Sequence, residues 1–214
     1  LRMLKRGRFV DHPYASALRG KWVSGFASAP GDGVWIATYG DGAFLARDGR
    51  TTHFHEAAGF PKNNLNGLVR GRGGFLWLLT NSGIYRVREE ALTARDARDA
   101  TPVPAKAYGR AHGLAYEETS GGQQPPAVLA RDGSLWFATS GGVARIGPQA
   151  QTTVGAAPRV HVDDVRADAS FERADQHALV FAKGTRAIEI DVSAPDLIDG
   201  KSILIRYRIR GFDP

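Results

Sequence analysis

The sequence contains no cysteine and only one methionine in 214 residues. Without thiols the chain has no disulfide framework, no thiolate metal site and no cysteine nucleophile. It also contains no apolar run near the roughly 20 residues that a membrane-spanning helix needs. The net charge is +6, yet the basic residues are scattered and form no run of five or six. Scattered charge indicates a solvated surface rather than a nucleic-acid or anionic-membrane interface.

Glycine and proline are abundant, at 26 and 11 residues, while hydrophobic residues make up 43% of the chain. The glycines and prolines separate short apolar runs instead of forming a low-complexity tract. This distribution is typical of many short strands joined by tight turns.

Three segments repeat one pattern: an aliphatic residue, a tryptophan, a threonine three places later, then glycine and an apolar pair. Their tryptophans are Trp35, Trp77 and Trp136, and their threonines are Thr38, Thr80 and Thr139. Another apolar stretch precedes each motif, and a segment such as residues 51–54 can close each unit as an outer strand. The pattern therefore predicts a meander of four strands per repeat. We expect the tryptophans to pack one repeat on the next, and the threonines to bond the following turn.

The spacing of the motifs indicates a β-propeller. Trp35 and Trp77 are 42 residues apart, the period of a four-stranded blade. The next interval is 59 residues, and its excess fits an insertion around residues 88–106 with a short helix over 89–98. The N-terminal residues match the third and fourth strands of a repeat, so we expect the chain to begin inside a blade. About three and a half repeats are visible, so either the chain is part of a longer one or copies associate.

We therefore predict an all-β protein with two domains. A partial β-propeller of four-stranded blades covers residues 1–148. A small polar linker follows over 149–157, and the first strands of an Ig-like β-sandwich cover 158–214.

The repeats resemble the two-component regulator propeller repeat, in which an Asp-x-x-Gly turn precedes Leu-Trp-[Ile/Phe]-[Gly/Ala]-Thr and Gly-[Leu/Val]. Residues 132–143 are the closest copy and residues 35–38 are similar. The middle repeat departs from the pattern, because Leu79 replaces the small residue and Gly73-Gly74 replaces the acidic turn. The C-terminal part resembles the opening, central and hallmark strands of the Y_Y_Y domain, at residues 157–165, 186–194 and 205–213.

The resemblance implies the periplasmic sensor region of a bacterial two-component receptor. In that family a transmembrane helix, absent from this sequence, leads to a histidine kinase or diguanylate cyclase output. The resemblance also implies a homodimer formed through the sandwich, with no nucleic-acid partner. Two alternatives stay open: a propeller enzyme acting on polysaccharide, as a lyase or glycosidase, and a protein-interaction scaffold.

No group of residues predicts catalysis, a metal site or a cofactor. His53 and His55 lie on one face of a strand, but no third ligand is near them in the sequence. The carboxylate pairs at 117–118 and 163–164 are adjacent on extended chain, so their members point to opposite faces. Glu89 and Glu90 belong to the expected helical insertion and are interpreted as surface residues.

A ligand site is predicted in the loops at one end of the blades. The loops that enter the innermost strands and the loops between second and third strands share that end. They cover residues 59–64, 112–122, 39–42, 81–83 and 140–142. Their side chains suit a polar small molecule or an oligosaccharide, although turns also favour such residues for backbone reasons. The candidate binding residues are Tyr39, Asp41, Lys62, Asn63, Asn81, Tyr116 and Glu117.

Overall fold

The computed structural model describes residues 1–95, 99–122, 125–152, 159–168, 170–173, 180–181, 183–195, 205 and 207–208. These residues form mainly antiparallel strands, which confirms the predicted all-β class. The chain divides into two compact units, Leu1–Thr153 and Val154–Pro214. The division falls inside the predicted linker, although the first residues of that linker, 149–152, form part of a helix.

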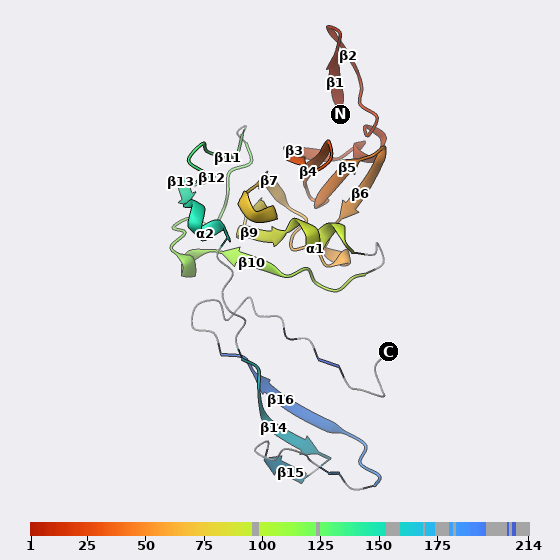
Figure 1. Ribbon diagram of the computed structural model, residues 1–214, viewed down its shortest axis with the longest axis vertical. Coiled ribbons are helices and arrows are strands. Elements are labelled where there is room, and N and C mark those ends of the chain that lie inside the picture. Colours follow the sequence, from red (N-terminus) through yellow and green to blue (C-terminus); the bar gives the residue numbers. More distant parts are fainter. Residues whose placement is uncertain are drawn as a thin grey trace. The chain divides into compact units, whose positions relative to one another are not determined.

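The first two repeats are four-stranded antiparallel sheets, as predicted (Figure 1). The first contains, in spatial order, β3 (Trp22–Ala29), β4 (Gly33–Tyr39), β5 (Ala43–Arg47) and β6 (Arg50–Phe54). The second contains β7 (Leu65–Arg70), β8 (Phe75–Thr80), β9 (Gly83–Arg88) and β10 (Ala105–Tyr108). Helix α1 (Glu89–Thr93) joins β9 to β10 and is shorter than the predicted 89–98 helix.

The third repeat has three strands among the described residues, rather than the predicted four. They are β11 (Ala127–Leu129), β12 (Leu135–Thr139) and β13 (Gly142–Ile146), followed by α2 (Pro148–Thr152). Single 3₁₀ turns lie at Ser16–Leu18, Glu56–Ala58, Arg72–Gly74 and Arg110–His112.

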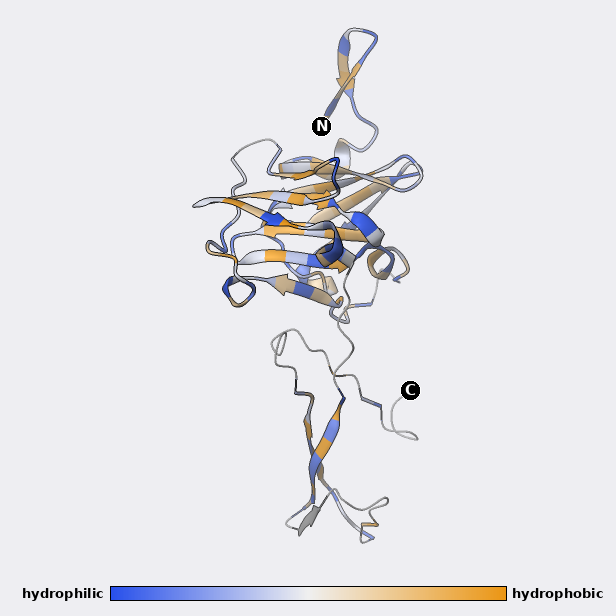
Figure 2. Ribbon diagram, turned by 60° about the vertical axis from the view of Figure 1, so that its left-hand side comes forward, coloured by the Kyte–Doolittle hydropathy of each residue, from blue (hydrophilic) through white to orange (hydrophobic). Residues whose placement is uncertain are grey.

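The core of the first unit lies between neighbouring sheets (Figure 2). Trp35 belongs to a buried cluster with Leu76 and Leu78 of the second sheet. Trp77 packs in the same way with Phe137 of the third sheet, at 5.9 Å between ring centroids. Both indoles are 0% exposed, which confirms the predicted packing of one repeat on the next. Trp136 is the exception: it is 41% exposed.

The turn after each tryptophan strand is closed by threonine, as predicted. The hydroxyls of Thr38, Thr80 and Thr139 donate to backbone carbonyls 2.8 to 3.0 Å away, those of Gly42, Gly83 and Gly142. Gly42 has a φ of +71°, and a Cβ there would collide with the carbonyl oxygen of Phe54. Glycine is therefore required at this position both for its backbone conformation and for the space.

The innermost strands are tied together by polar side chains at irregularities in the ladder. The pairing shifts between Val23 and Gly25, and the Ser24 hydroxyl donates to the carbonyl of Leu65 in the next repeat at 2.7 Å. The equivalent shift in β7 carries Asn66, whose amide donates to the Thr119 carbonyl at 2.6 Å. Each bulge thus points a polar side chain forward to the following repeat.

The N-terminal residues form a separate hairpin of β1 (Arg2–Lys5) and β2 (Arg8–Asp11), at the red end of Figure 1. Its turn residues Arg6 and Gly7 have positive φ, as do Asp48 and Gly49 between β5 and β6. Two successive positive φ values are the feature of a type I′ turn. The hairpin therefore has the local structure expected for the third and fourth strands of a repeat.

The second unit contains a three-stranded antiparallel sheet in the order β15-β14-β16. Its strands are β14 (His161–Ala167), β15 (Ser170–Arg173) and β16 (Ile188–Ser193). β14 and β16 fall where the opening and central strands of the sandwich were predicted. Among the described residues of this second unit there is only this one sheet, and most of the predicted strand at 205–213 lies outside the described residues.

Candidate ligand-binding site

An exposed pair of aromatic rings marks the strand ends where β3 begins and β4 ends. Trp22 and Tyr39 are direct partners in the β3–β4 ladder. Their ring centroids are 6.0 Å apart with an interplanar angle of 53°. Trp22 is 74% exposed and Tyr39 is 41% exposed. Large rings that stay in solvent on a rigid sheet offer a flat apolar surface to a ligand.

A relay of hydrogen bonds fixes the tyrosine of this pair. The side-chain amide of Asn81 donates to the Tyr39 hydroxyl at 3.2 Å. Asn81 in turn accepts a 2.7 Å bond from the amide of Asn66, which is 6% exposed. Asn66 also contacts Thr119, so the relay connects all three repeats. The structure therefore brings together two predicted residues, Tyr39 and Asn81.

A charged pair lies beside the aromatic rings. The Lys21 ammonium is 2.5 Å from the Asp41 carboxylate, and both side chains are about one-third exposed. The His53 ring lies 2.6 Å from the backbone carbonyl of Asp41, and it stacks on Phe44 at 4.2 Å with an interplanar angle of 3°. Asp41 is thus held by groups from two segments of the first repeat, Lys21 and His53.

The rings of His53 and His55 lie 4.7 Å apart. Within the described parts of the chain, no three His, Asp or Glu side chains are grouped as a metal site requires.

Asn63 holds the loop between β4 and β5 through hydrogen bonds to its backbone. Its carbonyl accepts from the backbone N–H groups of Gly40 and Gly42, and its side-chain oxygen accepts from the N–H of Glu56 at 2.9 Å. Lys62 extends over the ring of Tyr85, with its ammonium 5.9 Å from the ring centroid. The backbone carbonyl and side-chain oxygen of Asn63 therefore bond other parts of the first repeat.

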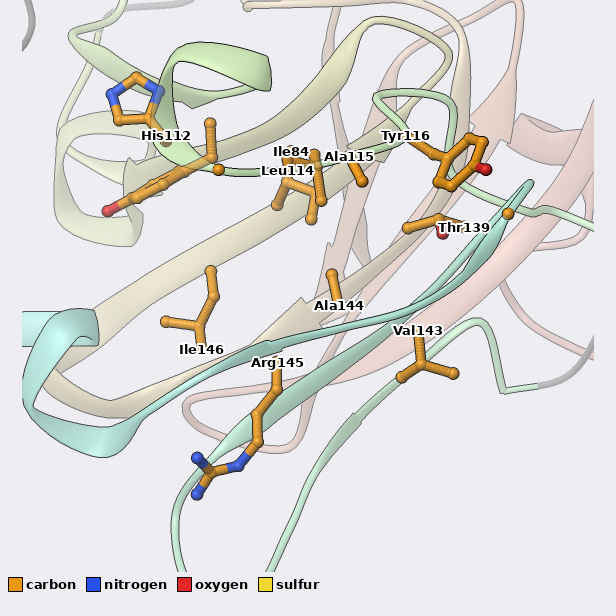
Figure 3. Close-up of a pocket in the computed structure, with 13 residues that line it drawn as sticks. Ile84, His112, Leu114, Ala115, Tyr116, Thr139, Val143, Ala144, Arg145 and Ile146 are labelled. Atoms are coloured by element: carbon orange, nitrogen blue, oxygen red, sulfur yellow. The ribbon is translucent and has the colours of Figure 1, made fainter.

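Tyr116 and Glu117 lie in the segment that joins the second repeat to the third, which we call the second junction. Their described contacts are with residues other than Trp22 and Tyr39. Tyr116 is 51% exposed and lines a pocket of about 360 Å³. Figure 3 shows it at one end, His112 at the other, and apolar side chains such as Leu114 between them. The Glu117 carboxylate accepts from the backbone N–H of Arg110 at 2.8 Å, so it braces its own loop. The predicted site thus separates into two groups, of which the aromatic group is richer in exposed rings and polar contacts.

Trp22 and Lys21 were missed by the sequence prediction. The repeat pattern accounts for three of the four tryptophans, and Trp22 is the one that it leaves over. A tryptophan at the start of a strand and outside the repeated position was the available signal.

Comparison with known proteins gives fold neighbours only. No family model matches the chain, and no curated protein matches it. Among solved structures, one similar chain is the extracellular domain of the putative hybrid two component system BT3049 from B. thetaiotaomicron. It is 17% identical over 74% of this chain and 26% of that chain, with a TM-score of 0.36. A second is the extracellular domain of the putative one component system BT4673 from B. thetaiotaomicron, 18% identical over 68% of this chain and 20% of that chain, with a TM-score of 0.40.

The chain thus spans about a quarter or less of the length of these two neighbours. In the part of the chain that the structure describes, no helix is long and apolar enough to cross a membrane.

Proposed function

We propose that the chain is the periplasmic ligand-sensing region of a bacterial two-component-type receptor, and that it binds a polar ligand at the Trp22–Tyr39 pair without converting it. The observation that carries this proposal is the exposed aromatic pair, whose tyrosine is oriented by a hydrogen-bond relay that starts at the buried Asn66. Ordering an exposed ring in advance lowers the entropy lost on binding. The repeat pattern and its resemblance to receptor propellers supply the receptor context.

The chemistry around the pair favours binding over turnover. A hydrolase or lyase needs an acid and a base that converge on one reacting bond. Asp41, two residues after Tyr39 in the chain, is held in an ion pair with Lys21. Rings for stacking, together with Asn81 and the charged pair for hydrogen bonding, suit a small polar molecule or an oligosaccharide. Dimerisation through the second unit would then transmit the signal in the intact receptor.

Calorimetric titration of the purified chain with a panel of defined oligosaccharides and polar metabolites tests the proposal. We expect saturable binding to at least one member, with no new reducing ends or unsaturated products. Affinity should fall about fivefold in Trp22→Ala, since a stacked ring contributes about 1 kcal/mol. Tyr116→Ala is the matched control from the second group, and we expect it to bind as the wild type does.

Product formation would instead support the polysaccharide enzyme. Equal loss in Tyr116→Ala and no loss in Trp22→Ala would move the site to the second junction. Failure of every panel member to bind would favour the alternative function, a protein-interaction scaffold.

A further inference from the structure

The third repeat differs from the other two at its outer edge. In the first two sheets the third strand pairs with a fourth: β5 with β6, and β9 with β10. β13 is the equivalent strand, and among the described residues it pairs with β12 alone. Its outer edge therefore presents backbone donors and acceptors that a further strand could use.

The fourth strand makes the same contact in both complete sheets. Its last residue is aromatic, Phe54 in β6 and Tyr108 in β10. These residues lie opposite Ala43 and Ile84 in the ladders. Each aromatic ring packs 5.2 Å from the tryptophan of its own repeat. The fourth strand therefore covers the tryptophan as well as the sheet edge.

The third repeat contains the residues that a fourth strand covers in the other two, and here they are exposed. Val143 occupies the position of Ala43 and Ile84, yet it is 69% exposed while they are 0% and 1% exposed. Trp136 is exposed in the same region, with the Arg145 guanidinium 5.5 Å above its ring. In Figure 3, the side chains of Val143 and Arg145 lie on the opposite side of β13 from those of Ala144 and Ile146. An open edge and an uncovered apolar strip therefore lie side by side.

We propose that the edge of β13 binds an extended peptide strand, antiparallel to β13, with an aromatic residue opposite Val143 and stacked on Trp136. Backbone hydrogen bonds would supply affinity, and the ring would set the register, as in other strand-addition complexes. The two filled edges in the same protein define the occupant: a polypeptide segment of four or five residues that ends on an aromatic residue. This proposal does not depend on the ligand site at Trp22 and Tyr39.

A synthetic peptide with the sequence of residues 49–55 is the probe, because it contains the strand that fills the first sheet. Fluorescein-labelled peptide is titrated into the full chain and followed by anisotropy, with hydrogen exchange to locate the protection. We expect saturable binding and protection of residues 142–146. Replacing the peptide's phenylalanine by alanine should weaken binding about tenfold, which corresponds to 1.4 kcal/mol. Trp136→Ala should do the same.

Two further variants separate this result from misfolding and from general stickiness. Val143→Lys places a charge at an exposed edge position and should weaken binding without changing the urea midpoint. Phe9→Ala removes another exposed ring, 68% exposed in the β1–β2 hairpin, and should leave binding unchanged.

Several results would overturn the proposal. One is equal binding of a peptide with proline in place of its second threonine, because proline cannot donate to a ladder. Another is protection at residues 43–47, which would mean exchange with β6. A concentration-dependent dimer protected at residues 142–146 would assign the edge to a second copy, and absence of saturable binding would leave it unoccupied.

Discussion

Substitution of Glu89 should clearly weaken the contact between the first two repeats. It begins α1 and is 5% exposed. One carboxylate oxygen accepts from the Trp35 indole nitrogen at 2.7 Å, and the other accepts from Arg70 at 2.8 Å. The Glu89 carboxylate, directly after the third strand of the second repeat, thus accepts a hydrogen bond from a buried donor of the first sheet.

Glu89→Ala leaves the buried indole N–H without an acceptor, which costs about 1–3 kcal/mol. The ion pair adds under about 1 kcal/mol, because the Arg70 side chain is 38% exposed and screened by solvent. We therefore expect a loss of about 1–4 kcal/mol. With a urea m-value of about 2 kcal/mol/M, the midpoint falls by about 0.5–2 M.

Tryptophan fluorescence during urea unfolding measures this effect, because Trp22, Trp35, Trp77 and Trp136 all belong to the first unit. Glu89→Gln keeps an oxygen acceptor and should lose about 1 kcal/mol. The adjacent, exposed Glu90→Ala is the matched control and should change stability by less than about 0.5 kcal/mol. Equal midpoints for the alanine variants at 89 and 90 would refute the reasoning.

Two other changes test the turns. Gly42→Ala should destabilise the chain by about 2 kcal/mol or more in the same urea assay, because it combines a positive φ with a collision against Phe54; Gly49→Ala, with positive φ but open space, should cost about 1 kcal/mol. Hydrogen bonds from the Ser134 hydroxyl and backbone N–H, with a contribution from Arg145, lower the pKa of Asp132 below its usual 3.8. This stabilisation is present above pH 3.8 and is lost as the pH falls through the folded-state pKa, so thermal melts of Asp132→Asn should lack that part of the acid destabilisation.

The repeat pattern made much of the first unit predictable from the sequence. The Trp and Thr positions located the second strands and their turns, because those residues serve the same contact in every repeat. The exposure of Trp136 could not be read in this way. Its local sequence matches that of Trp35 and Trp77, and only the presence or absence of a covering element distinguishes them.

Long-range partners account for the other errors. Glu89 was interpreted as a surface residue beside Glu90, but its acceptor role depends on Trp35, which is 54 positions earlier in the chain. The binding residues were predicted as one set because their loops share one end of the strands. Glu117 and Asn63 instead support backbone N–H groups, a role that adjacent residues in sequence do not reveal. Ser24 and Asn66 did carry a signal, since each precedes a glycine in the first strand of its repeat.

Three side-chain donors at the contacts between repeats have their acceptors later in the chain, and this orders events during synthesis. Ser24 and Trp35 find their acceptors on Leu65 and Glu89, and Asn66 finds its own on Thr119. Because the ribosome releases the N-terminal segment first, each repeat emerges before the groups that satisfy it. A nascent sheet must therefore wait for about one further repeat of translation before its buried donors are paired.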